Sequence, residues 1–315
     1  MARHITLKYI VRCASLHRGS DRPSGSEGKH MRHRVTDSIL AVAFATAVVV
    51  ALVTLWSAET EGQGAAYQAP RLMGTPDPDL TGIWQAMGTA HWDVEDHGVE
   101  PGPFPTQMGT WGVQPAGQSV VVGGRIPYQA WALEKRRENF ESRLTMNPDE
   151  LSTQGDPEAK CMMPGIPRAT YLPFPFQIIQ TRSKILVAYQ FNVAKRTIHM
   201  ENHTEAPIDF WMGWSNGHWE GDTLVVDVTG FNGLTWLDRA GNFHSEALHV
   251  VERFTPIGPH HIMYEATLED PNVYTEPWTI RMPLYRRLEE NAQLLEFRCV
   301  DIVEEFIYGS LVKAQ

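Results

Sequence analysis

Several common sequence motifs are missing from this 315-residue sequence, and each absence excludes a class of function. It contains no Rossmann or P-loop glycine pattern and no His-Glu-x-x-His motif, which excludes the usual nucleotide-binding and zinc-protease signatures. Basic side chains are in deficit, with 27 Lys and Arg against 37 Asp and Glu. A net charge of −10 without a basic patch argues against nucleic-acid binding. After Trp56 no apolar run is long enough to span a bilayer.

The N-terminal 65 residues differ in composition from the rest of the chain. Basic residues at 32–34 precede an apolar run, Ile39 to Trp56, and a small polar segment follows it. This order is typical of an export signal, either cleaved or kept as a signal anchor. We therefore expect membrane contact only through residues 39–56, if they are uncleaved. Both alternatives place the remaining chain, residues 66–315, in the periplasm or outside the cell.

Residues 66–315 are expected to form one acidic domain. The first 65 residues carry eight Lys or Arg and five Asp or Glu, a net charge of +3, so the rest of the chain carries −13. Of the three cysteines, Cys161 and Cys299 fall in this domain. An oxidising compartment permits a disulfide between them. The sequence does not set their distance in space, so the bridged and free states both stay open.

The stretch from Trp211 to Phe254 carries the strongest fold signal. Its Glu220-Gly221-Asp222 triplet predicts a tight hairpin turn, because glycine adopts a positive φ without steric cost. β-branched residues follow at 223–228, as in a half-buried strand. About nine or ten strands are expected after residue 79. They include 185–191, 195–201, 245–255, 262–269, 278–284 and 294–300. We predict a mainly β fold, an antiparallel barrel with a loop of this stretch closing one mouth.

Two other segments interrupt the strand pattern. Residues 85–125 are rich in Gly, Pro and aromatic residues, which predicts a long N-terminal insertion at the surface, over the mouth. Residues 127–144 predict the one helix, with a partly apolar stripe made of Tyr128, Trp131, Phe140 and Leu144.

Alternation along the strands leaves two assignments of the barrel faces. One strand face carries four ionisable side chains, Asp227, His249, Arg253 and Glu265. In one assignment the opposite, apolar face fills the barrel, and these four form a solvated outer face with weak ion pairs. In the other assignment they line a polar cavity. Glu246 and Glu252 accompany the apolar face, and they need partners if buried, because a lone buried carboxylate is costly.

Five longer motifs carry a family resemblance. They are Pro78–Trp84, Cys161–Arg168, Pro175–Thr181, Trp219–Asp227 (Trp-Glu-Gly-Asp-Thr-Leu-Val-Val-Asp) and His244–Phe254 (His-Ser-Glu-Ala-Leu-His-Val-Val-Glu-Arg-Phe). Together they resemble an uncharacterised family of exported bacterial β-proteins, and Gly82-Ile83-Trp84 resembles the opening of lipocalin-type barrels. The resemblance implies a calycin-like barrel over residues 77–300. It carries no established chemistry.

The ionisable residues near the mouth predict acid–base chemistry. A histidine beside a carboxylate acts as a general base near neutral pH, and an arginine stabilises a developing oxyanion. We predict His249 or His244 as the base, and Arg253 as the oxyanion stabiliser. The orienting partner or acid is sought among Glu252, Asp238 and the nearby Asp227. The alternative is a solvated charge network on a strand.

Substrate binding is predicted for aromatic residues that stack on an aromatic or polycyclic ligand. The binding candidates are Trp236, Trp214, Tyr274, Trp278 and Arg168, with the barrel core as the alternative place for the aromatic ones. We expect no metal site from His244, His249, His260 and His261, because the first two point to opposite faces of one strand. Ser215 matches Gly-x-Ser-x-Gly, but a hairpin strand follows it where a nucleophile elbow needs a helix.

These features predict a lyase, dehydratase or isomerase that needs no cofactor. Its substrate would be a hydroxylated aromatic or terpenoid small molecule bound in the barrel. The competing prediction is a periplasmic carrier of hydrophobic ligands without turnover. A carrier would have an apolar interior and ionisable groups outside, whereas an enzyme would have them converging inside. The sequence does not set the oligomeric state.

Overall fold

The computed structural model describes residues 67–101, 113–143 and 155–299. All of them belong to one compact unit, Ala65–Gln315. The predicted export segment lies outside the described residues. Within the described part of the chain, no helix is long and apolar enough to cross a membrane.

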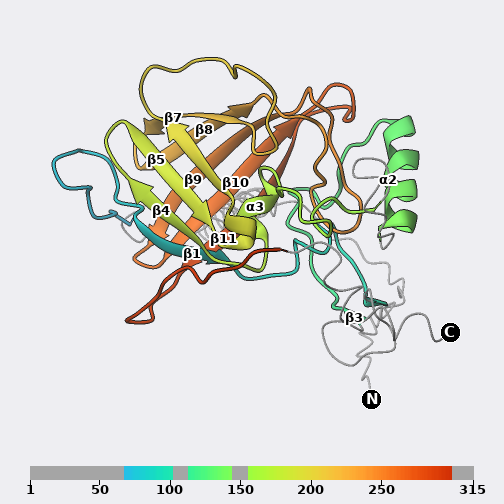
Figure 1. The fold of residues 1–315 in the computed structure, drawn as a ribbon, viewed down its shortest axis with the longest axis horizontal. Coiled ribbons are helices and arrows are strands. Elements are labelled where there is room, and N and C mark those ends of the chain that lie inside the picture. The colour runs from blue at the N-terminus through green and yellow to red at the C-terminus, as the bar shows by residue number, and fades with distance from the viewer. Residues whose placement is uncertain (1–66, 102–112, 144–154, 300–315) are drawn as a thin grey trace, which may run out of the picture. The chain divides into compact units, whose positions relative to one another are not determined.

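Nine strands close into a barrel in the order β1-β11-β10-β9-β8-β7-β6-β5-β4 (Figure 1). Every neighbouring pair is antiparallel except β6 and β7, which run parallel. The strands are β1 (Gly82–Ala86), β4 (Phe176–Gln180), β5 (Lys184–Tyr189), β6 (Lys195–His199), β7 (Trp214–Glu220), β8 (Thr223–Thr229), β9 (His249–Gly258), β10 (His261–Glu269) and β11 (Trp278–Arg286). The prediction of a mainly β, calycin-like barrel is confirmed.

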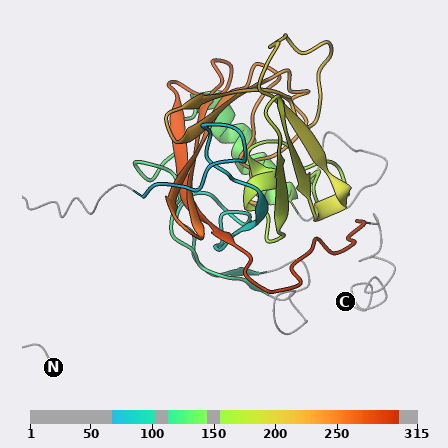
Figure 2. The ribbon, with the colours of Figure 1, turned by 90° about the vertical axis from the view of Figure 1, so that its left-hand side faces the viewer.

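Short elements lie outside the barrel wall. Strands β2 (Glu100–Pro101) and β3 (Val113–Gln114) form a two-stranded sheet. Helix α2 (Ala130–Ser142) is the long helix, α3 (Arg168–Tyr171) a single turn and η2 (Phe191–Val193) a 3-10 turn. In two perpendicular views α2 lies off one end of the barrel (Figures 1 and 2). We call this end, where β4 begins and β8 ends, the mouth.

The hairpin predicted around Gly221 is present. Gly221 has φ 59°, and β7 pairs with β8 from Trp214↔Thr229 to Glu220↔Thr223. A left-handed residue at the tip lets the two strands continue their twist across the turn. The hairpin therefore sets the register of the strand pair that leads into the mouth residues.

Two predicted strands need correction. The strand expected at 245–255 runs from His249 to Gly258 instead, because the Ser245 backbone N–H and hydroxyl both bond the Asp270 carboxylate and hold its start in a loop. The prediction of a strand at 294–300 is wrong for the residues of this range that the structure describes, because they form no β-ladder. There the Phe297 ring packs at a tilt against Phe174 and Phe191, at 4.7 and 5.7 Å between ring centroids.

The predicted apolar stripe of the helix is wrong at Trp131, whereas Tyr128 packs against the core just before the helix and Phe140 is partly buried. Trp131 is 53% exposed, whereas α2 buries Ala132 and Asn139. The Asn139 amide donates to the Gly241 carbonyl at 3.1 Å, so the helix docks on the mouth through a hydrogen bond and a small residue. The Leu144 of the predicted stripe lies outside the described residues.

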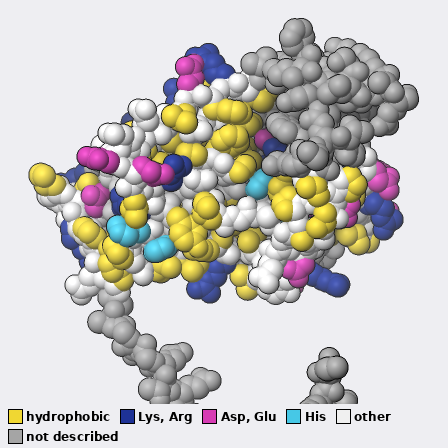
Figure 3. Space-filling model, turned by 90° about the horizontal axis from the view of Figure 1, so that it is seen from below, with side chains coloured by type: hydrophobic (Ala, Val, Ile, Leu, Met, Phe, Trp, Pro, Cys, Tyr) yellow, Lys and Arg dark blue, Asp and Glu magenta, His cyan; other side chains and the backbone are white. Residues whose placement is uncertain are grey.

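The described part of the predicted insertion is not only a surface segment. Ala90, Trp92 and Val94 are buried, and Val122 donates its backbone N–H to the carbonyl of Thr279 in β11. Away from the mouth, charged side chains of both signs lie scattered among hydrophobic ones on the face shown in Figure 3.

Alternation along the strands decides what fills the barrel. The inward side chains of β9 and β10 include Val250, Phe254, Tyr264 and Leu268, all between 0 and 2% exposed. Large aromatic and aliphatic side chains of the other strands, such as Trp84 and Phe176, complete the same core. The apolar face therefore points inward, which leaves the other face of these strands to solvent.

Candidate functional site

His249 and Arg253 lie on the outside of the barrel. His249 pairs with Asp227 at 2.5 Å, and Arg253 pairs with Glu220 at 2.8 Å, each pair with side chains more than one-third exposed. The assignment of these residues to a polar cavity is wrong, because the apolar side chains between them have to be buried. His249 and Arg253 are thus in no position to serve a site inside the barrel as base and oxyanion stabiliser, and Asp227 lies outside with them.

Replacing His249 by Ala is expected to change the free energy of unfolding by less than about 1 kcal/mol, because exposed ion pairs contribute little. Chemical denaturation of the variant and the wild-type protein checks this. A loss several times larger would show that the pair supports the barrel wall more strongly than its exposure indicates.

Glu252 is the ionisable residue of β9 that does point inward. It accepts a bidentate pair from Arg196 at 2.6 and 3.1 Å and a hydrogen bond from the Tyr264 hydroxyl at 2.8 Å. The Arg196 guanidinium also reaches the Ser215 hydroxyl at 3.4 Å. Glu252 is fully buried, and its carboxylate oxygens serve these partners. The structure brings Glu252 together with Arg196, and not with the predicted His249.

The residues that face the mouth come mainly from one loop, residues 230–248, which we call the mouth loop. Within it Trp236 bridges to Phe243, and the Leu237 N–H donates to the Asn242 carbonyl at 2.6 Å. The loop thus doubles back on itself, with Thr235 beside His244 at its base and Asp238 beside Asn242 at its tip. Burial of Phe231 and Leu237 anchors it on the core.

At the base of the mouth loop a histidine and a hydroxyl group form a buried pair. The His244 Nδ1 faces the Ser245 carbonyl at 2.8 Å, so a neutral ring carries its proton there. The Nε2 atom then accepts a hydrogen bond from the Thr235 hydroxyl at 2.6 Å. Burial lowers the pKa of His244, which keeps the ring neutral. Gly165 lies directly on this pair: a Cβ there would meet the Thr235 hydroxyl at 2.6 Å.

At the tip of the loop two carboxyl groups share one amide. The Asn242 Nδ2 donates to Asp238 at 2.6 Å and to Asp93 at 3.1 Å. Asp238 is fully buried and also accepts the Val94 N–H at 3.0 Å. Burial and then the Asp93 carboxyl raise the pKa of Asp238 to about 8, against the N–H donors, which favour its ionised form. Burial beside Asp93 therefore shifts Asp238 toward its acid form.

The same tip continues into a network that is closed by tyrosine and arginine. The Tyr128 hydroxyl donates to the Asn242 side-chain oxygen at 3.0 Å, and Arg136 of α2 pairs with Asp93 at 3.2 Å. Every polar atom of the Asn242 amide has a partner, so the tip is held in one arrangement.

A second ionic cluster lies beside the loop. Arg168, predicted to bind substrate, is 1% exposed and forms a bidentate pair with Asp156 at 2.8 and 2.7 Å. It also contacts Glu158 at 3.2 Å, and Glu158 forms a second bidentate pair, with Arg239, at 3.0 and 3.2 Å. These contacts occupy both terminal nitrogens of Arg168, whereas its buried Nε has no partner among the described residues.

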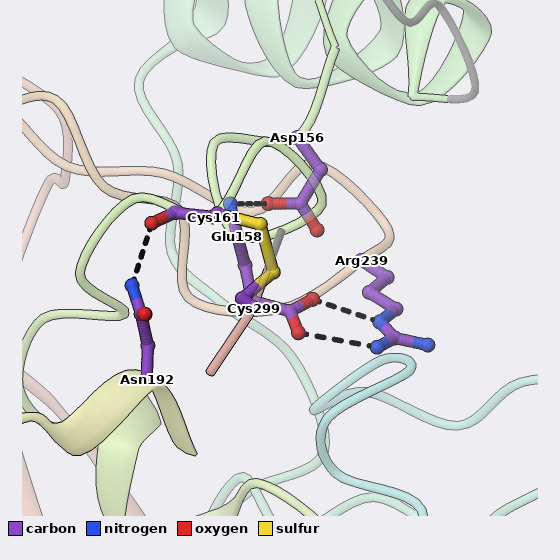
Figure 4. Close-up of a disulfide and its surroundings, with 6 residues drawn as sticks. All are labelled: Asp156, Glu158, Cys161, Asn192, Arg239 and Cys299. Carbon is purple, nitrogen blue, oxygen red and sulfur yellow. Dashed lines mark hydrogen bonds and ion pairs between the residues drawn. A yellow bond between two sulfur atoms is a disulfide. The ribbon is translucent and has the colours of Figure 1, made fainter. Parts of the chain in front are cut away.

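Cys161 and Cys299 form a disulfide beside this cluster, with Cα atoms 5.2 Å apart (Figure 4). The open question of the two cysteines is thus decided in favour of the bridge. On the other side of Cys161, its carbonyl accepts a hydrogen bond from the Asn192 amide at 2.7 Å. The bridge joins the 155–168 segment, which carries Glu158, to the last described residue of the chain.

The predicted aromatic ligand candidates are divided by the fold. Trp236, Tyr274 and Trp278 are buried at the mouth, where Tyr274 stacks edge-on against Trp278 at 5.4 Å. Trp214 instead lies on the outer wall, stacked on His199 at 4.7 Å. The mouth thus gathers His244, Asp238, Arg168 and three of the four predicted aromatic residues.

The four histidines considered for a metal are not brought together. His249 begins β9, and His260 and His261 follow its other end, about 30 Å away at about 3.3 Å per residue. Among the described residues no group of three or more His, Cys, Asp or Glu could hold a metal ion.

Several mouth residues were not predicted from the sequence, notably His91, Asp93, Thr235, Arg239 and Asn242. The first two belong to a segment without periodicity, and no pattern marked them. Arg196 was also missed, although its alternation with Ile198 on β6 was a usable signal. Comparisons with protein-family models, curated proteins and solved structures found no match to this chain.

Proposed function

We propose that this protein is a cofactor-independent acid–base enzyme of the lyase, dehydratase or isomerase class, with its site in the mouth loop. The proposed substrate is a hydroxylated aromatic or terpenoid small molecule. One observation carries the proposal: a single buried loop holds a histidine in its basic form and a carboxyl group in its acid form. Titratable groups whose surroundings shift their pKa values in opposite directions are typical of acid–base sites.

His244 supplies the base in this proposal, and the Thr235 hydroxyl is its contact to the substrate. The hydroxyl takes a proton from the substrate while its own proton moves to the His244 Nε2. The Ser245 carbonyl keeps the other ring nitrogen protonated, so the lone pair always faces Thr235. The nearby Asp270 carboxylate favours the charged ring that results.

Asp238 supplies the acid. A carboxyl group with a pKa near 8 is protonated at neutral pH and can give its proton to a leaving hydroxyl group. The Asp93 carboxyl favours this acid form, and the Asn242 amide holds the group in position. Asp238 thus retains its predicted role as acid, while the predicted Glu252 is replaced, because its carboxylate is bound to Arg196.

The carrier remains the second candidate. It predicts an apolar interior with ionisable groups outside, and the outward His249 and Arg253 fit that description. The buried Arg196–Glu252 pair does not, because an ion pair in the interior serves no hydrophobic ligand. The disulfide supports the proposed location outside the cytoplasm, since such bridges persist in oxidising compartments.

Solvent-deuterium exchange tests the proposed chemistry. The wild-type protein is incubated in D₂O with hydroxylated aromatic and terpenoid compounds, and exchange or elimination is followed by NMR. Thr235→Val, which removes only the hydroxyl, is expected to slow exchange about 100- to 10,000-fold. Thr235→Ser keeps the hydroxyl and should retain most of the activity. His249→Gln, on the outer wall, should behave as the wild-type protein does.

Melting curves recorded on each variant separate lost chemistry from lost folding. Equal exchange rates in Thr235→Val and Thr235→Ser would show that the hydroxyl carries no proton, which would contradict the proposed base. Saturable binding of a ligand, with no deuterium exchange in any compound, would favour the carrier over the enzyme.

A further inference from the structure

We infer that Arg239 and His91 form a carboxylate-binding subsite at the mouth, so that the substrate of the proposed enzyme bears a carboxylate group. The inference rests on the proposed function for its meaning, but it concerns residues that the acid–base step does not use. It follows from two neighbouring residues, each of which has a side-chain nitrogen without a hydrogen-bond partner among the described residues.

Arg239 has one free edge. Its Nε and Nη2 atoms bind the Glu158 carboxylate, and no hydrogen bond from Nη1 is formed within the described ranges. The side chain is 32% exposed, and in Figure 4 its outer nitrogen points away from Glu158. The guanidinium stacks over the Trp92 ring at 4.6 Å, which fixes its plane. A guanidinium held in this way presents donors to a planar acceptor from solvent.

His91 lies next to Arg239 and has an unused nitrogen. The backbone N–H of Arg239 donates to the backbone carbonyl of His91 at 3.1 Å, and both side chains contact Trp92, the imidazole with its ring centroid at 5.3 Å from that of Trp92. His91 is 7% exposed, and its buried Nδ1 has no partner among the described residues. Buried polar atoms nearly always have a hydrogen-bond partner, so an unpartnered one marks a place for a ligand atom or a water.

The surrounding charges favour a single negative charge on the ligand. Glu158 and Asp156 lie next to the two arginines, so the cluster is close to neutral and has no net positive charge to hold a dianion such as phosphate. Burial, and then the Arg239 charge, lower the pKa of His91 to about 3, so the imidazole offers one N–H donor and no charge. One guanidinium edge and one N–H donor match the two oxygens of a carboxylate.

Acetate and acetamide test the subsite, because they have nearly the same size and differ in charge. Each is titrated into the full-length protein, and the His91 ring signals are followed by NMR, assigned by their absence in His91→Gln. We expect a saturable shift with acetate and none with acetamide. Arg239→Lys keeps a positive charge for Glu158 but loses the guanidinium edge, and it should weaken acetate binding at least tenfold. The matched control is Arg253→Lys on the outer wall, which should bind acetate as the wild-type protein does.

The inference is overturned if acetate causes no saturable shift, if acetamide shifts the signals equally, or if Arg239→Lys binds acetate unchanged. The NMR readout of acetate binding needs no turnover, so the proposed subsite and the proposed chemistry can each fail without the other. Acetate binding without any deuterium exchange would support the subsite while removing the proposed chemistry.

Discussion

Glu252→Gln is expected to lower the free energy of unfolding by about 3–5 kcal/mol, because removing one partner of a buried ion pair leaves an uncompensated charge. Arg196 and Glu252 have side chains 3 and 0% exposed, so water cannot replace the lost carboxylate. The Tyr264 hydroxyl loses its charged acceptor in the same change. Urea denaturation monitored by circular dichroism measures the loss.

Glu246→Gln is the matched control, since Glu246 is exposed on the mouth loop and should change stability by less than about 0.5 kcal/mol. The double variant Arg196→Met, Glu252→Gln should lose less than the sum of its parts, because no buried charge is left behind. A loss below about 1 kcal/mol in Glu252→Gln would mean that the barrel interior admits water.

Cys299→Ser is expected to cost about 5 kcal/mol by the chain-entropy relation, since the bridge to Cys161 closes a loop with a sequence separation of 138 residues. The unfolded chain gains most of its freedom when so long a loop opens. Wild-type protein under a reducing agent should unfold at the same denaturant concentration as the variant, and both should lie well below the oxidised protein.

The double variant Cys161→Ser, Cys299→Ser distinguishes the bridge from the side chains, and it should match the single variant. Phe297 also packs against Phe174 and Phe191, and neither variant removes these side chains. Equal stability of the oxidised protein and the variant would show that the unfolded chain is already compact around these segments.

Local patterns predicted the barrel wall well. The Glu-Gly-Asp turn between β7 and β8 and the alternation in β8, β9 and β10 were readable, because turn chemistry and the two-residue period of a strand act between near neighbours. The strand expected at 294–300 failed for the complementary reason. Its residues have strand propensity, but ring contacts and the disulfide hold them in an irregular path.

The candidate site was predicted only in part. His244 and Asp238 belong to the mouth loop and were recognised from their residue types and position. Their partners were not, because Asp93 reaches the loop from 149 positions before Asn242, and Glu158 from 81 before Arg239. No periodicity relates residues at such distances.

The sequence by itself determined that this protein is mainly β, where its central hairpin turns and which residues share a strand face. Only the tertiary structure decided that His249 and Arg253 face outward, that Glu252 meets Arg196 inside, and that His91 lies against Arg239. The physical reason is that alternation divides the side chains of a strand between two faces but does not tell which face points inward. The inward face is decided by the total apolar surface that is buried when nine strands close, and the sequence of a single strand does not contain that information.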